Sequence, residues 1–182
     1  MIRSIALIEL NSIARGIGTA DAMLKSAEVR LLFSKPVCPG KFIILVTGEV
    51  GAVKAAERAG IDYGGQFVVD NVLISNVHPD VIEAINCNAT IDKVNAIGII
   101  EFFSISASVV AADAAAKAAQ VKLIEVRLGM GIGGKSYVTL TGDVSSVKTA
   151  VEVGANAVVH TGMLLTKEVI ASPRKEVFNN LL

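Results

Sequence analysis

Hydrophobic and polar positions follow two kinds of pattern along this chain, and the two kinds alternate. Short runs rich in Ile, Val and Leu, such as SIALIEL and AIGIIEF, predict strands. Ala-rich stretches with apolar residues at helical spacing, such as ARGIGTADAMLKSAE and ASVVAADAAAKAAQ, follow these runs and predict helices. Strands that alternate with helices in a unit of about 90 residues indicate an α/β fold, in which helices pack on one sheet.

The same order of elements occurs twice in the sequence. Residues 3–32 align with residues 95–124 at an offset of 92, with 12 of the 30 positions identical, and beyond residue 40 the offset becomes 94. The matches include glycine and polar positions, which two unrelated apolar patterns would not share by chance. We therefore predict two homologous domains, 1–87 and 94–182, joined by a linker near Asn86–Lys93.

Each copy is expected to hold a four-stranded sheet with flanking helices. The later strands are predicted at KFIILVTG and QFVVDNVLISN in the first copy, and at KSYVTLTG and ANAVVHTGMLL in the second. The helices EVGAVKAAERAG and DVSSVKTAVEVG begin with an acidic residue and end in glycine, as helices often do. The segments HPDVIEAI and TKEVIAS are expected to close the two copies.

Composition narrows the classes of function. Basic and acidic residues number 17 each. The sequence contains no basic block that would indicate a nucleic-acid partner and no basic amphipathic stretch that would indicate a membrane surface. No apolar run approaches the roughly 20 residues of a membrane span, and the N-terminal run carries Glu9, so we interpret it as a strand and not as a signal peptide. Two distant cysteines indicate a reducing cytosol. The 52% hydrophobic content predicts surface buried between subunits.

Several matched residues carry a family resemblance. Both copies contain Ile-Glu, then Ala-Asp-Ala-x-x-Lys-x-Ala-x-Val, then a Gly-Lys strand, then Thr-Gly-Asp/Glu-Val-x-x-Val-Lys-x-Ala. This order resembles the bacterial microcompartment (BMC) shell domain in tandem and unpermuted, and it covers nearly the whole chain. With its cysteine loop, the chain is most similar to the iron–sulfur T-type shell proteins of propanediol-utilisation microcompartments. The resemblance implies a homotrimer, a pseudohexagonal tile that packs with other shell proteins in a cytoplasmic microcompartment shell.

The two copies differ most where the family places its central pore. The second copy keeps a glycine-rich loop, GMGIGG, whereas the first has Pro-Val-Cys-Pro-Gly in the stretch KPVCPGK. We therefore expect a pore lining made by the following residues: Val37, Cys38, Pro39, Gly40, Gly131, Gly133 and Gly134.

Threefold symmetry would multiply the single cysteine of this loop. If the loop faces the axis of a trimer, three Cys38 thiolates converge there. Iron–sulfur clusters take cysteine thiolates as ligands, so the hypothesis is one 4Fe–4S cluster per trimer, bound by Cys38. Zn²⁺ with a fourth ligand is an open alternative. Lys35 and Lys41 are expected to favour the thiolate, and the flanking prolines to limit collapse of the loop.

Other candidate residues have simpler explanations. A lone cysteine is usually a buried or idle thiol, and Cys87 in the linker is interpreted as incidental. His78 before Pro79 indicates a helix start, and His160 is expected to be packed in the fourth strand. The string GMGIGGKS matches the spacing of a nucleotide-binding loop, but a strand is predicted after it, and phosphate binding requires a helix there.

The resemblance also implies contacts at the edges of the tile. Lys25 and Lys117 match each other in the repeat and lie where shell domains place an edge lysine. Arg174 follows Ser172-Pro173 and resembles a C-terminal proline–arginine segment near the edges. Taken alone, each lysine would be interpreted as a solvated side chain on a helix.

Three functions remain open from the sequence. The first is a structural, non-enzymatic shell protein with a redox-active pore, which transfers electrons across the shell or delivers a cluster to a redox enzyme inside or outside it. The second is a metal-free tile whose pore conducts a metabolite. The third is a small-molecule-binding regulator or an enzyme that uses the GMGIGGK loop and a cysteine nucleophile.

Overall fold

The computed structural model describes residues 4–91 and 95–178 and divides into two compact units. Unit 1 joins the residues up to Val77 with Gly129–Gly134, and unit 2 joins His78–Leu128 with the residues from Lys135 on. The predicted boundaries 1–87 and 94–182 stay a prediction. Part of the expected linker Asn86–Lys93 lies outside the described residues.

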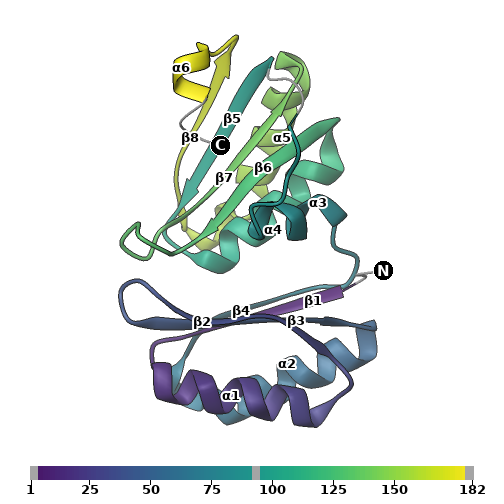
Figure 1. The fold of residues 1–182 in the computed structure, drawn as a ribbon, viewed down its shortest axis with the longest axis vertical. Helices are drawn as coiled ribbons and strands as arrows, with labels where there is room; N and C mark the ends of the chain where they lie inside the picture. Colours follow the sequence, from purple (N-terminus) through teal and green to yellow (C-terminus); the bar gives the residue numbers. More distant parts are fainter. Residues whose placement is uncertain (1–3, 92–94, 179–182) are drawn as a thin grey trace. The chain divides into compact units, whose positions relative to one another are not determined.

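Unit 1 is an antiparallel four-stranded sheet with two helices on one face (Figure 1). The strand order is β2-β3-β1-β4, so that β3 and β1 are the two central strands. Apolar side chains of β1 and β3 are buried against Met23 of α1 and Val53 of α2. The elements are β1 (Ser4–Leu10), α1 (Ile13–Ser26), β2 (Arg30–Val37), β3 (Lys41–Gly48), α2 (Val50–Gly64), η1 (Gly65–Phe67) and β4 (Val68–Ile74).

Unit 2 repeats this plan with strand order β6-β7-β5-β8. It also contains α3 (Pro79–Ile85), which follows β4 in the chain and packs against β6 and α4. The other elements are β5 (Ala96–Phe102), α4 (Ile105–Ala118), β6 (Val121–Leu128), β7 (Ser136–Gly142), α5 (Val144–Ala157), η2 (Val159–Thr161), β8 (Leu164–Ala171) and α6 (Lys175–Phe178). The predicted α/β class and a four-stranded sheet in each copy are confirmed.

The end of the second copy differs from the prediction. The stretch ANAVVHTGMLL was expected to be the fourth strand, but α5 continues to Ala157 and His160 lies in η2. Gly162 then takes a left-handed conformation (φ +69°), and β8 begins two residues later. The run TKEVIAS, expected to close the copy, therefore lies almost wholly in β8. Alanine favours helix continuation, which is why this apolar run did not form a strand.

Strand pairing gives the structural alignment of the two copies. Ile5 of β1 pairs with Ile74, and Ile97 of β5 pairs with Ile170, so the offset is 92 for the first strands and 96 for the last. The two additional residues of the second copy lie between η2 and β8. As a result, His78 at the start of α3 corresponds to Arg174 at the start of α6.

Polar residues shared by the copies have local structural roles. Ser12 and Ser104 cap α1 and α4, each accepting a hydrogen bond at 3.3 Å from the backbone N–H three residues on. Lys25–Asp21 and Lys117–Asp113 are ion pairs of 2.6 Å one turn apart on the same two helices.

Candidate functional site

The predicted cysteine loop is a tight turn between two paired strands. Val37 ends β2 and pairs with Lys41, the first residue of β3, so only Cys38, Pro39 and Gly40 lie outside the ladder. The Gly40 N–H donates to the Val37 carbonyl at 3.0 Å, and Gly40 itself has a φ of +91°. Glycine adopts this conformation at little cost, which explains why it follows the second proline.

Cys38 is half-buried at the tip of this turn, while Pro39 and Gly40 are exposed. Its backbone N–H donates to the Gly129 carbonyl at 3.2 Å, which fixes the backbone from which the thiol projects. The peptide bond between Cys38 and Pro39 is cis. Cys38 therefore lies in a turn whose backbone is fixed by a hydrogen bond, and the residue is partly exposed to solvent.

The glycine-rich stretch Gly129–Gly134 lies against this turn within unit 1. A Cβ atom on Gly134 would stand 2.6 Å from Pro39 Cδ and 2.9 Å from the Cys38 carbonyl oxygen, and the φ of Gly134 is +81°. A side chain is thus excluded at this position both by space and by backbone conformation. The structure brings these two sets of predicted pore-loop residues together.

The same stretch does not have the geometry of a nucleotide-binding loop. It is followed by β7, which begins at Ser136, as the sequence predicted. A phosphate loop needs a helix N-terminus at this place, whose free N–H groups face the phosphates. The literal match of GMGIGGKS to that motif is therefore without structural support.

An ion pair lies at the base of each loop. The Lys41 ammonium is 2.7 Å from Glu9 Oε1, and the Glu9 side chain is only 1% exposed. In unit 2 the repeat-related pair joins Lys135 to Glu101 at 2.5 Å, with the carboxylate 28% exposed. Sequence reasoning did not pair these residues, although both members match between the copies, and that shared identity was the available signal.

The two lysines expected near the thiol have contacts with other side chains. Lys41 is held by Glu9, and the Lys35 ammonium lies 3.6 Å from the centre of the Phe33 ring. Both residues lie in strands that flank the turn, where cross-strand and neighbouring side chains reach them first. The expectation that they favour a Cys38 thiolate stays a prediction.

The described residues of one chain do not assemble a metal site by themselves. No group of three or more His, Cys, Asp or Glu side chains within residues 4–91 and 95–178 is placed to hold an ion. Cys87, the other cysteine, is exposed, and its Sγ lies 3.9 Å from Glu125 Oε1 in unit 2. The described part of the chain therefore brings no two further side chains of these types to Cys38.

A second polar cluster occurs on β6 and β7 of unit 2. Tyr137 donates to Glu125 Oε2 at 2.7 Å, and Arg127 Nε lies 2.5 Å from the other carboxylate oxygen. Burial and the Glu125 carboxylate raise the pKa of Tyr137 above its ordinary value of 10.0. In unit 1 the positions of Glu125 and Tyr137 are filled by Phe33 and Ile43. Because only one copy has this cluster, the sequence repeat gave no signal for it.

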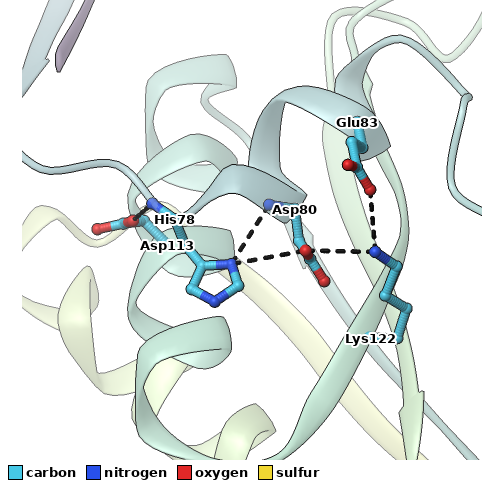
Figure 2. Close-up of polar contacts among 5 residues, drawn as sticks. All are labelled: His78, Asp80, Glu83, Asp113 and Lys122. Atoms are coloured by element: carbon cyan, nitrogen blue, oxygen red, sulfur yellow. Dashed lines mark hydrogen bonds and ion pairs between the residues drawn. The ribbon is translucent and has the colours of Figure 1, made fainter. Parts of the chain in front are cut away.

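A network at the start of α3 joins that helix to α4 and β6 (Figure 2). The His78 backbone N–H donates to Asp113 Oδ1 at 2.8 Å, and His78 Nδ1 accepts from the Asp80 N–H at 3.3 Å. Lys122 contacts both Asp80 Oδ1, at 3.2 Å, and Glu83 Oε2, at 2.9 Å. The prediction that His78 marks a helix start is confirmed.

The predicted edge residues have different surroundings. The Lys25 side chain is 75% exposed on α1, whereas the Lys117 side chain is 41% exposed and its partner Asp113 is also bound by α3. Arg174 is exposed just before α6. Their role at tile edges stays a prediction.

Comparison with known proteins decides the family. A family model described as the BMC domain matches residues 4–77 and again residues 96–173. The chain belongs to the BMC domain family. It carries the domain twice. Separately, no described helix is long and apolar enough to cross a membrane.

Individual relatives agree with this assignment. The chain is 42% identical over 182 residues to the bacterial microcompartment shell protein PduT of Citrobacter freundii, covering 100% of this chain and 99% of that protein. A crystal structure of a microcompartment protein from Desulfitobacterium hafniense has 51% identity and a TM-score of 0.92, covering 98% and 99% of the two chains. The fused permuted hexameric shell protein MSM0275 from the RMM microcompartment has 27% identity and a TM-score of 0.64, over 86% and 81%.

The recognised family and fold class are thereby confirmed. The chain is a structural microcompartment shell protein whose two BMC domains run in tandem, and its place is the shell of that compartment.

Proposed function

We propose that this shell protein forms a homotrimeric, pseudohexagonal tile whose threefold axis holds an iron–sulfur cluster bound by Cys38 of each chain. The carrying observation is the position of Cys38 at the tip of the β2–β3 turn, half-buried, with its backbone held by Gly129. It stands in the loop in which the two BMC domains differ most.

The donor chemistry fits such a group. Cysteine thiolates are the standard ligands of [4Fe–4S] clusters, and three symmetry-related thiols supply three of the four positions. The described residues of one chain offer no competing metal site. Gly131 and Gly133 have left-handed backbones, and a Cβ built on either meets no neighbour within 4 Å, so this part of the pore loop has room beside the turn.

A bound cluster would supply one-electron transfer through the shell. Each chain would position one thiol and form the shell around it. Three thiols would leave the fourth iron without a ligand from these cysteines. The partners expected from this role are other shell proteins and a redox enzyme inside or outside the compartment, which exchanges electrons with the cluster or receives it.

The test is the metal content of anaerobically purified protein. We expect four irons and four sulfides per trimer, and broad absorbance near ~400 nm that is lost in Cys38→Ser. Cys87→Ser is the matched control, because Cys87 is also accessible but lies in unit 2. This variant should retain iron, sulfide and colour.

Two results would overturn the cluster assignment. A colourless wild-type trimer without iron would favour a metal-free tile whose pore passes a metabolite. Zinc bound with Cys38-dependent stoichiometry, and no sulfide, would favour the alternative of three thiolates and a fourth ligand.

A further inference from the structure

The glycines of the loop between β6 and β7 are of two kinds. Gly131 and Gly133 are exposed, and a Cβ atom built on either would meet no atom of a non-neighbouring residue within 4 Å. Gly129 and Gly134 are buried. All four have a positive φ, between +66° and +81°, so backbone conformation alone does not distinguish the two kinds. The buried pair differs from the exposed pair in its contact with the Cys38 turn.

Gly129 holds the backbone of the turn at the cysteine itself. Its carbonyl oxygen accepts a hydrogen bond from the Cys38 N–H at 3.2 Å, and this N–H lies outside the β2–β3 ladder. The bond fixes the peptide unit that precedes the Cys38 Cα atom. Because the direction of a Cα–Cβ bond follows from the peptide units on either side of it, this contact restricts where the thiol can point.

Gly134 meets the turn on the other side, at the peptide unit that follows Cys38. A Cβ atom at Gly134 would stand 2.9 Å from the Cys38 carbonyl oxygen and 2.6 Å from Pro39 Cδ, and both distances are shorter than side chains tolerate. The two contacted groups are a peptide carbonyl and a proline ring, which are stiff and cannot rotate away as a flexible side chain could. A methyl group at Gly134 would therefore displace the turn.

The repeat shows that this contact is specific to the second loop. Gly134 matches Gly40 at the offset of 94, and each is followed by a lysine. Gly40 also has a positive φ, of +91°, but a Cβ atom built on it would meet nothing within 4 Å. The shared Gly-Lys sequence therefore fixes the backbone conformation in both copies, and only the copy without the cysteine uses its glycine to approach another loop closely.

We infer that the glycine-rich loop of the second BMC domain is a positioning element for Cys38. The Gly129 carbonyl and the absent side chain of Gly134 set the direction of the thiol, so one domain supplies the ligand and the other supplies the backbone that orients it. The consequence for an iron–sulfur cluster rests on the proposed function, because groups that orient the ligands of a metal centre affect both its occupancy and its reduction potential. The consequence for the thiol itself holds without a cluster.

Gly134→Ala and Gly131→Ala form a matched pair of variants. Their φ angles are +81° and +75°, so an alanine is strained to a similar degree at both positions, but its methyl group meets the Cys38 turn only at Gly134. In anaerobically purified protein, Gly134→Ala should lower the iron and sulfide bound per trimer at least about threefold. It should also shift the reduction potential of the remaining cluster in a redox titration followed by visible absorbance. Gly131→Ala should keep the wild-type metal content and potential.

The direction of the thiol is also measurable in protein without a cluster. The chain has two cysteines, so Cys38 is the only thiol in a Cys87→Ser background. The rate at which N-ethylmaleimide adds to this thiol should change about fivefold or more in Gly134→Ala, and less than about twofold in Gly131→Ala. A general loss of stability from the strained alanine would alter the rate in both variants, whereas displacement of the turn alters it in one.

The outcomes separate this inference from the proposed function. Equal effects of the two alanine variants on the maleimide rate overturn the positioning role, with or without iron in the wild type. A wild type that binds no iron overturns the cluster, and the maleimide comparison then tests the positioning role by itself.

A measurement on the wild-type chain covers the case in which Gly134→Ala does not fold. The Cys38 amide, held by the Gly129 carbonyl, should exchange its hydrogen with solvent at least about tenfold more slowly than the amide of exposed Gly133. Hydrogen exchange followed by NMR measures both amides in one sample. Equal exchange rates would show that Gly129 does not hold the turn and would overturn the inference.

Discussion

At the scale of single residues, the Glu9 carboxylate is a buried charge near the site that needs a partner of opposite charge. Its side chain is 1% exposed, and among the described residues Lys41 is the cation that pairs with it, at 2.7 Å. An unpaired buried charge is far more costly than an unpaired exposed one. The pair therefore ties the first residue of β3 to the end of β1 and holds the base of the turn.

Replacing Lys41 by Met should lower the free energy of unfolding by about 3 kcal/mol, since it leaves Glu9 buried without a cation. The repeat provides a control in Lys135→Met, where Glu101 is 28% exposed and water can replace part of the lost interaction. That change should cost about 1 kcal/mol. Denaturant unfolding measures both, and equal losses would show that burial of the carboxylate does not decide the cost.

At the scale of elements, the two BMC domains use the same strands and helices but differ in how their terminal segments are held. α3 is bound at its start by Asp113 and along its length by Lys122. α6 has four described residues, with Val177 exposed. The difference lies in which surface each segment reaches within its own unit.

Lys122→Ala should loosen α3 without unfolding the sheet, because it removes the cation shared by Asp80 and Glu83. We expect amide hydrogen exchange in residues 79–85 to accelerate about tenfold, which corresponds to about 1.4 kcal/mol of local stability. Lys25→Ala is the control, since it removes a lysine from an exposed helical ion pair. Unchanged exchange in α3 after Lys122→Ala would show that its apolar face alone holds it.

At the scale of the whole molecule, the proposed tile would present one set of groups to its pore and another set to its neighbours. Lys25 and Lys117 match in the repeat, and both are predicted at tile edges, but their surroundings differ. Lys25 is largely solvated, whereas Lys117 also neutralises an Asp113 that α3 partly buries.

Lys25→Ala should therefore weaken tiling while leaving the melting temperature of the isolated protein within about 1 °C, since an exposed ion pair contributes little. Lys117→Ala should weaken tiling and also lower the melting temperature by several degrees. Electron microscopy of sheets and thermal unfolding measure the two effects. Normal sheets from both variants would remove these lysines from the edge contacts.

Much of this protein was determined by its sequence alone. The α/β class followed from the alternation of strand and helix patterns. The tandem repeat followed from shared positions, including Ser, Asp and Lys residues. These residues form helix caps and ion pairs one turn apart, which depend on local spacing in the sequence. The Cys38 turn and the strand after Gly134 were also predictable locally. The fourth strand of the second copy was misplaced, since periodicity does not separate a short apolar strand from the end of an Ala-rich helix.

Only the tertiary structure decided which residues meet across long separations in the chain. It placed Gly134 against Pro39, paired Lys41 with Glu9, and set the two-residue shift that aligns His78 with Arg174. These results depend on strand register and on which surface each segment covers. Register and burial arise from packing between distant segments, and no local pattern of residues encodes them.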